Sequence, residues 1–302
     1  MNVSVIVVTR NRCNMLIRAI ESILSNETKA NELIIIDNNS EDKTEEKIKK
    51  YLKKHDNIKY YKEKKVGISY ARNLGLKKAN GEIIIYTDDD CVVAKNWIGN
   101  IKKSHLKYPD AYAIGGKTLN YPNNLIGYCG HMHRIFLTLE TIIGEKIDYK
   151  KAERTLDKPH YMSYLATQNI SYKKNKIIGI VFRNDIDPVE AVDFSWKIYS
   201  RNKKSIIYDP EITVFHEYRK NLIELIKQNY EYGKKAKKLN KISRSNGYYC
   251  KKAVNPLQRE INYIKFIYFY IYRNKIKSID KIKIFILMFL REIAFAIPYY
   301  FS

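Results

Sequence analysis

Cysteine is scarce in this 302-residue chain, and no cysteine lies close to another. The absence of a C-x-x-C pair argues against a zinc knuckle, and the wide spacing argues against a disulfide framework. A reducing cytosolic environment therefore fits the composition best. The four cysteines are Cys13, Cys91, Cys129 and Cys250.

Long hydrophobic runs are also missing. No stretch approaches the roughly 18 uninterrupted apolar residues that span a bilayer, because charged residues such as Lys265 and Arg291 interrupt the apolar runs near the C-terminus. The apolar segment Val3 to Val8 has no basic leader before it and no small-residue cleavage site after it. We therefore expect a strand there and no export signal.

Acidic residues are outnumbered by basic ones. Lys and Arg total 55 against 32 Asp and Glu, a formal net charge of +23. This surplus favours a polyanionic partner, whether nucleotide phosphates, nucleic acid or anionic lipid. Residues 217–302 hold 19 Lys and Arg against 6 Asp and Glu, so +13 of the net charge lies in the C-terminal part.

Short apolar runs alternate with helical patterns over the first ~115 residues, which predicts βαβ units and a mostly parallel sheet. The runs are apolar almost throughout, as expected of strands that helices cover on both faces. We therefore assign the chain to the α/β class. The expected strands are Val3–Thr9, Leu33–Asp37, Ile58–Lys62 and Ile83–Thr87.

The periodicity weakens after Gly115 and returns near Asp187. Asp187-Pro188 predicts the start of a helix that continues to about Arg201, with proline at the first helical position. Two strands, Ser205–Tyr208 and Ile212–Phe215, and a helix over about 222–239 are expected next. Residues 256–302 have the pattern of two amphipathic helices.

Three consecutive carboxylates, Asp88, Asp89 and Asp90, follow the fourth expected strand. Ligands of open α/β sheets bind beyond the carboxyl ends of the strands. Neighbouring carboxylates repel one another, and a bound Mg²⁺ or Mn²⁺ relieves that repulsion while bridging substrate phosphate oxygens. The alternative interpretation is a solvated acidic turn.

Two further segments carry candidate binding groups. Asp37 ends the second strand, where its carboxylate can accept the imide N–H of a base or can close an Asx-turn. Arg72 lies on the helix before the three aspartates and can pair with diphosphate oxygens, unless it is only a surface arginine. No P-loop or dinucleotide-binding glycine pattern is present.

Four segments occur in the order and spacing typical of one enzyme family, and together they resemble the family-2 glycosyltransferases of the GT-A fold over roughly residues 2–240. The resemblance implies a GT-A type, Rossmann-like mixed sheet flanked by helices. It implies one catalytic domain, residues 1–240, with a nucleotide-sugar-binding half (1–115) and an acceptor-binding half (116–240). The basic amphipathic helical tail (241–302) is expected from its own composition and lies outside the resemblance. The segments are Val3-Ser-Val-Ile-Val-Val-Thr-Arg-Asn11, Ile35-Ile-Asp-Asn-Asn-Ser40, Gly67 to Asn73 and Thr87-Asp-Asp-Asp-Cys91.

The same resemblance implies a chemistry. A sugar would move with inversion from a nucleotide-sugar donor, a UDP-sugar first of all, to a saccharide or lipid-linked acceptor in cell-surface glycan synthesis. Mn²⁺ or Mg²⁺ would lie at Asp88 and Asp90. Thr9 and Asp37 would recognise the base, and the donor would also contact Arg72, Asp88 and Asp89.

An inverting transfer needs a carboxylate that takes the proton of the acceptor hydroxyl. The family's usual Glu-Asp pair corresponds here to Glu190-Ala191, so the second acid is absent. Glu190 is the first choice for the base, and Asp193 lies on the same helical face three residues later. The alternative is structural, because Asp187-x-x-Glu190 also fits a capping box.

His216 closes an expected strand at a position where the resembling enzymes often place a histidine near the metal. Imidazole suits Mn²⁺ better than Mg²⁺, and the alternative is a structural hydrogen-bonding group. His131 and His133 have no acidic neighbours in the sequence, so we leave them out of the metal site.

The C-terminal helices combine Ile, Phe and Tyr with Lys and Arg, which is typical of helices that lie in a bilayer interface. Packing on the catalytic domain or on a second subunit is equally compatible, and the oligomeric state stays open. We expect a cytoplasmic protein peripheral to the inner face of the cell membrane.

Two other classes are weighed against a glycosyltransferase. A nucleotidyltransferase should carry a glycine-rich phosphate loop after its first strand, and Thr9-Arg-Asn-Arg-Cys13 contains no glycine. A non-catalytic nucleic-acid-binding protein would explain the charge and the many tyrosines, but not three carboxylates at a strand end. We therefore expect no nucleic-acid partner.

Overall fold

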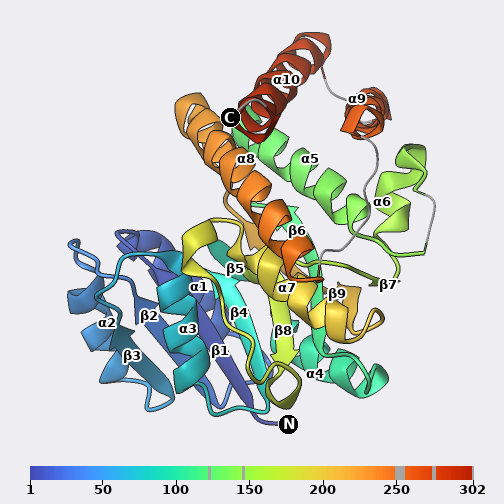
Figure 1. Ribbon diagram of the computed structural model, residues 1–302. Helices are drawn as coiled ribbons and strands as arrows, with labels where there is room; N and C mark the ends of the chain where they lie inside the picture. Colours follow the sequence, from blue (N-terminus) through green and yellow to red (C-terminus); the bar gives the residue numbers. More distant parts are fainter. Residues whose placement is uncertain (122–123, 145–146, 249–255, 274–276, 301–302) are drawn as a thin grey trace.

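The protein is described here by a computed structural model, which covers residues 1–121, 124–144, 147–248, 256–273 and 277–300. Its centre is a mixed sheet with the strand order β3-β2-β1-β4-β8-β6-β9-β5, and β7 pairs with β9 (Figure 1). The strands are β1 Val3–Thr9, β2 Glu32–Asp37, β3 Ile58–Lys62, β4 Ile83–Asp88, β5 Cys91–Val93, β6 Ala113–Asn120, β7 His160–Tyr161, β8 Ile170–Lys173 and β9 Ile206–His216.

Helices cover both faces of this sheet, and α3 and α7 lie in front of it in Figure 1. The helices are α1 Cys13–Leu24, α2 Thr44–Leu52, α3 Ile68–Lys78, α4 Trp97–Lys107, α5 Leu125–Glu140, α6 Ala152–Thr155, α7 Glu190–Arg201, α8 Leu222–Ser245, α9 Pro256–Arg273 and α10 Ser278–Tyr300. The α/β class and the C-terminal helical extension are confirmed.

Strand β1 shows why the strands of the first half could be predicted from the sequence. Its side chains alternate between two cores: Val5 and Val7 pack with α1 and α4, and Ile6 packs with α3 on the other face. Both faces are buried, so the strand is apolar throughout. The four parallel strands β3, β2, β1 and β4 agree with the prediction to within one residue at each end.

The second half corrects two expectations. Helix α7 begins at Glu190, and the Asp187–Pro188 bond before it is cis, so proline does not occupy the first helical position. The two strands expected around Pro210 are one strand, β9, whose pairing with β6 shifts between Gly116 and Lys117. That shift leaves Pro210, which has no N–H to donate, outside the ladder.

Gly116 marks a close approach of backbones beside this shift. A Cβ atom there would lie 1.9 Å from the carbonyl oxygen of Ile212, so no side chain fits. Helix α5, in the region of weak periodicity, was not expected. It packs Phe136 into the same core as Phe194 of α7 and Phe266 of α9.

The C-terminal helices pack on the catalytic half by one face only. Tyr263, Phe266 and Met288 are buried in the core that α5 shares, while Tyr268 and Phe289 are more than half exposed. Helix α8 runs without a break across residue 240 and packs against α10. Within the described residues, no helix is both long enough and apolar enough to cross a bilayer.

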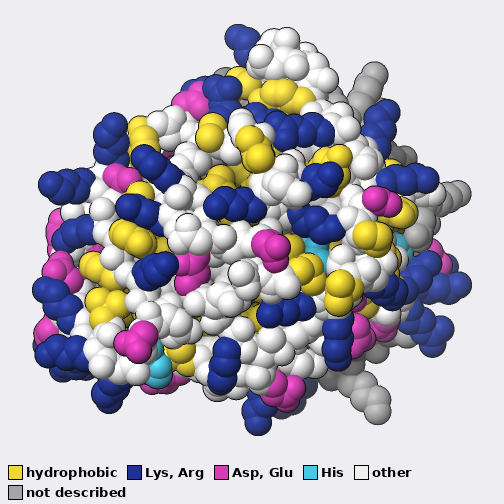
Figure 2. Space-filling view, turned by 90° about the horizontal axis from the view of Figure 1, so that it is seen from below, with side chains coloured by type: hydrophobic (Ala, Val, Ile, Leu, Met, Phe, Trp, Pro, Cys, Tyr) yellow, Lys and Arg dark blue, Asp and Glu magenta, His cyan; other side chains and the backbone are white. Residues whose placement is uncertain are grey.

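Positive charge extends well beyond these helices. Figure 2, which looks at the molecule from below the view of Figure 1, shows Lys and Arg side chains around the whole outline of that face, among acidic and apolar ones. The basic residues behind the net charge of +23 are therefore not confined to the C-terminal part.

Candidate functional site

The three aspartates lie where the fold brings together the ends of β1, β4 and β9. Strand β4 ends at Asp88, and β5 begins at Cys91 after a two-residue turn. Because β1 runs parallel beside β4, Thr9 reaches this turn, and its hydroxyl donates to Asp89 over 2.8 Å. Thr9 and Asp89 are therefore adjacent, as the shared edge of parallel strands predicts.

Arg12, which our sequence analysis did not single out, supplies a cation to the same turn. Its Nη1 lies 3.0 Å from a carboxylate oxygen of Asp89 and 3.0 Å from one of Asp90. Arg12 is the N-cap residue of α1, three positions after the end of β1. That position at the sheet edge was the available signal, since loops after parallel strands share the same edge.

The two carboxyls of the turn differ in proton affinity. Burial and the adjacent Asp90 charge raise the pKa of Asp89 to about 7, against the opposing effects of Arg12 and Thr9. Burial acts on Asp90 in the same direction, but the charges of His216 and Arg12 hold the pKa of Asp90 well below its usual range. Asp90 is thus the ionised member of this pair.

The pairing of β5 with β9 brings His216 next to Asp90. Cys91 lies opposite His216 in that antiparallel ladder, and Nε2 of His216 is 3.2 Å from Oδ1 of Asp90. Asp90, Cys91 and His216 each offer a ligand atom within 4.8 Å of the others. The expected proximity of Asp90 and His216 is therefore present in the fold.

Asp90, Cys91 and His216 differ in how well they can bind a divalent cation such as Mg²⁺ or Mn²⁺. Burial and the nearby Asp90 and Asp88 carboxylates raise the pKa of the Cys91 thiol well above its usual value. A protonated thiol is a poor ligand, and Mg²⁺ prefers oxygen donors while imidazole suits Mn²⁺. Asp90 and His216 therefore fit a divalent ion.

Arg72 joins Asp88 to Glu190. Its guanidinium donates to Oε1 of Glu190 and lies 3.3 Å from Oδ1 of Asp88. Arg72 and Glu190 are buried, at 4% and 1% exposure, whereas the Asp88 side chain is 27% exposed. Among the residues that the structure describes, nothing donates a hydrogen bond to Oε2 of Glu190.

The capping-box interpretation of Asp187 and Glu190 is wrong. Asp187 accepts hydrogen bonds from the backbone N–H and the hydroxyl of Ser69 and so caps α3 instead of its own helix. Val189 is the N-cap of α7, without a side-chain capping bond. Glu190 is therefore not engaged at the helix terminus, and its Oε1 accepts from Arg72 instead.

Asp193 and Asp37 are fully buried and already engaged. Asp193 accepts from the hydroxyl of Tyr248 over 2.6 Å, and Nζ of Lys197 lies 2.6 Å from its other oxygen. Asp37 accepts from the Ser40 N–H, closing a turn, and from Tyr60. The structure does not join either residue to Arg72, and their catalytic and base-binding roles stay predictions.

Comparison with known proteins agrees with the family resemblance found in the sequence. The profile of glycosyl transferase family 2 matches residues 4–168, more than half of the chain. An uncharacterized glycosyltransferase of Rickettsia bellii is 41% identical over 88 residues, 29% of this chain and 13% of that protein. The first three curated relatives are matched over only 13–16% of their length.

Other relatives are named for their acceptors. The GalNAc(5)-diNAcBac-PP-undecaprenol beta-1,3-glucosyltransferase of Campylobacter jejuni is 40% identical over 29% of each chain. A dolichyl-phosphate-linked glucuronosyltransferase of Methanococcus voltae is 26% identical over 76% of this chain and 71% of its own.

Solved structures confirm the GT-A type fold. The mannosyltransferase PcManGT from Pyrobaculum calidifontis, in complex with GDP-Man and Mn²⁺, superposes with a TM-score of 0.62 at 15% identity. The superposition covers 99% of this chain and 87% of the mannosyltransferase chain. TarS of S. aureus gives a TM-score of 0.54 at 16% identity, over 99% of this chain and 90% of its own.

Unfolding measurements test the interaction between the buried side chains of Arg72 and Glu190. Arg72→Met leaves the Glu190 carboxylate buried without its cation, so we expect a loss of about 3–5 kcal/mol in the free energy of unfolding. Arg72→Met combined with Glu190→Gln should lose clearly less, because residue 190 then carries no buried charge, and Asp88, which also pairs with Arg72, is partly exposed to solvent. Denaturant titration at pH 7 measures both values.

The exposed pair Lys49 and Glu45 is the matched control. Lys49→Met should change the free energy of unfolding by less than about 0.5 kcal/mol. Strictly additive losses for Arg72→Met and Glu190→Gln would show that the two side chains do not interact.

Proposed function

The chain belongs to glycosyl transferase family 2, and from this premise we propose that it transfers a sugar from a nucleoside diphosphate sugar to an acceptor hydroxyl with inversion at the anomeric carbon. The observation that carries the proposal is the group of carboxylates at the end of β4, which faces His216 of β9 and Glu190 of α7. This membership also argues against a nucleotidyltransferase and against a non-catalytic nucleic-acid-binding protein.

In this proposal Asp90 and His216 hold Mn²⁺ or Mg²⁺, and Asp88 completes the protein's ligands. Their support is the 3.2 Å contact between Asp90 and His216 and the low pKa of Asp90, which keeps a negative charge at the site. A bound divalent ion supplies charge neutralisation for the departing diphosphate. A UDP-sugar is the first donor to test, with Thr9, Asp37 and Asp89 on the nucleotide side.

Glu190 is the proposed base. Arg72 fixes its Oε1, and Oε2 is the atom left to accept the proton of the acceptor hydroxyl. As that proton transfers, the hydroxyl oxygen bonds to the anomeric carbon, and the bond from that carbon to the diphosphate breaks. Asp193 is a weaker choice, because Tyr248 and Lys197 already engage its two oxygens.

We propose an acceptor held at an anionic membrane, as the names of the Campylobacter and Methanococcus relatives suggest. One face of α9 and α10 leaves large apolar side chains exposed at 46% or more, a composition that suits a bilayer interface. In the described part of these helices the exposed side chains are Ile264, Tyr268, Tyr272, Ile279, Ile282, Phe285, Ile286, Phe289 and Ile297.

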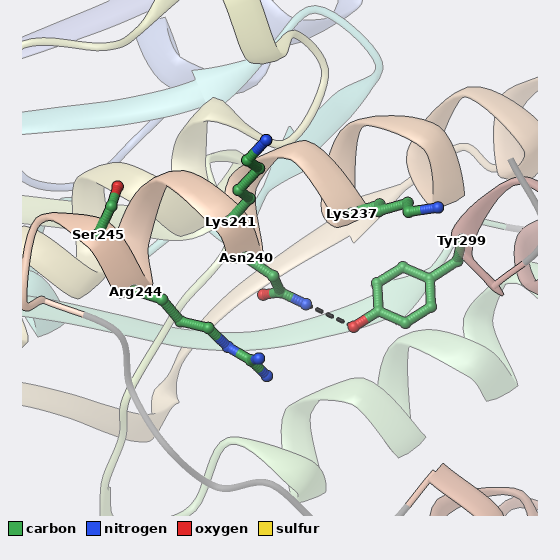
Figure 3. Close-up of a pocket in the computed structure, with 6 residues that line it drawn as sticks. All are labelled: Lys237, Asn240, Lys241, Arg244, Ser245 and Tyr299. Atoms are coloured by element: carbon green, nitrogen blue, oxygen red, sulfur yellow. Dashed lines mark hydrogen bonds between the residues drawn. The ribbon is translucent and has the colours of Figure 1, made fainter.

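A basic groove lies between α8 and α10, the second of the two helices that carry this face. It encloses about 630 Å³ and is lined by Lys237, Lys241 and Arg244, among others. Figure 3 shows Asn240 hydrogen-bonded to Tyr299 between Lys237 and Arg244. Cations next to apolar side chains match the headgroups of anionic lipids, each contributing about 1 kcal/mol near the surface.

Glu190→Gln tests the proposed base. A donor is first found by thermal shift with UDP-, GDP-, dTDP- and CMP-sugars. Turnover with that donor, measured as nucleoside diphosphate release, should then fall by about 10²–10⁴-fold in Glu190→Gln, because the amide cannot accept the proton. The donor's thermal shift should persist. Asp193→Asn is the matched control; if it abolishes turnover while Glu190→Gln retains it, the base is Asp193.

Membrane contact is tested by point substitution, because deletion of α9 and α10 would uncover the core of α5, where Phe136 packs against Phe266 of α9. Phe285→Ser with Phe289→Ser should weaken binding to phosphatidylglycerol vesicles by about tenfold or more, since each lost Phe contact removes about 1.5–3 kcal/mol. Sedimentation with vesicles measures the binding. Leu106→Ser with Ile178→Ser, exposed apolar residues outside these helices, should bind like the parent; equal binding by both pairs refutes the assignment of this face.

A further inference from the structure

Helix α5 carries an arginine that the proposed reaction does not use. Arg134 is largely buried, and its guanidinium interacts with the phenols of Tyr164, Tyr218 and Tyr232. Within the described ranges, no Asp or Glu forms an ion pair with Arg134, and nothing accepts a hydrogen bond from its buried Nε. A buried cation without a counter-ion is costly and calls for an anion.

Other charges around Arg134 do not supply that anion. The nearby His131, one turn earlier on α5, has its pKa lowered to about 4 by burial and by His216 and Lys117, so it is neutral at pH 7. Lys117 itself pairs with Asp157 over 2.8 Å. The surroundings are therefore neutral or positive, and a negatively charged ligand is the missing partner.

Arg134 also lines a small cavity of about 20 Å³, next to Tyr164, Thr138 and Gly116. That space accepts one water-sized group, such as a single phosphate oxygen, but not a sugar ring. The hydroxyl of Tyr164 is a further hydrogen-bond donor beside it, whereas the Thr138 hydroxyl already donates to the carbonyl oxygen of Arg134. A planar guanidinium with a hydroxyl donor is well suited to phosphate oxygens.

The cavity adjoins the proposed catalytic site. The ring of Tyr218, whose phenol interacts electrostatically with Arg134, packs edge-on against His216 with ring centroids 4.3 Å apart. His216 contacts Asp90. All residues around the cavity come from positions 116–169, and none comes from the first 115 residues, which we assign to the nucleotide sugar.

We infer that Arg134, with Tyr164, forms a binding site for a phosphoryl group beside the sugar-transfer site. The inference rests on the proposed function, which assigns the part of the chain around the cavity to the acceptor. The phosphoryl group is one carried by the acceptor, such as the phosphate of a lipid-linked saccharide. The diphosphate of the donor has the same chemistry, and the experiment below separates the two sources.

Calorimetric titration of the full chain with inorganic phosphate tests the site. We expect Arg134→Gln to weaken phosphate binding at least tenfold and to leave the melting temperature equal or higher, because the variant removes a buried unpaired charge. Arg134→Lys keeps the charge but loses the planar fork, and should bind about three- to tenfold more weakly than the parent. Lys117→Gln, which removes a neighbouring cation, should bind like the parent.

Titration with UDP identifies the source of the phosphoryl group. Unchanged UDP binding in Arg134→Gln assigns the site to the acceptor, and parallel loss of UDP and phosphate binding assigns it to the donor diphosphate. Phosphate binding in Arg134→Gln and Arg134→Lys equal to that of the parent overturns the inference. These titrations do not depend on turnover. If the protein transferred no sugar, the proposed function would be refuted, but phosphate binding that depends on Arg134 would still support this inference.

Discussion

The site depends on the neutralisation of carboxylates that the fold forces together. Strand β4 delivers Asp88, Asp89 and Asp90 to one short turn, where their mutual repulsion opposes folding. Two arginines and a histidine from three different elements contact these carboxylates and offset that repulsion: Arg12 before α1, Arg72 on α3 and His216 at the end of β9. The pKa values of Asp89 and Asp90 move in opposite directions, so the turn keeps its negative charge mainly on Asp90.

These ion pairs also connect the two halves of the sheet. Arg72 lies in the first half and Glu190 in the second, and the contact of Asp90 with His216 crosses the same boundary. Residues of both halves of the sheet therefore share one electrostatic network. Arg134 stands at the edge of this network through Tyr218, as a cation whose counter-ion the described part of the chain does not provide.

The sequence was informative where a local pattern determined the structure. The strands of the first half were predicted closely because helices bury both of their faces, and Asp88 to Asp90 were placed because they follow such a strand directly. His216 was expected near Asp90 from the family resemblance, and the pairing of Cys91 with His216 in the ladder accounts for that proximity.

The remaining features depend on long-range contacts, which a local pattern does not contain. Asp187 and Glu190 have the spacing of a capping box, but Ser69 and Arg72 of α3 compete for their carboxylates and determine the outcome. Arg12 was missed because a single arginine in a loop has no periodicity. Helix α5 and the register shift around Pro210 likewise depend on tertiary packing that overrides weak local signals.

Metal-dependent binding of a nucleotide sugar is the most direct test of this account. We expect one of the tested nucleotide sugars to raise the melting temperature further with Mn²⁺ than without it, with a stabilisation of about 2.7 kcal/mol at a hundredfold excess over its Kd. Asp90→Asn combined with His216→Ala should remove the part that depends on Mn²⁺. A folded double variant that retains the full Mn²⁺-dependent stabilisation would contradict the role assigned to this cluster of carboxylates.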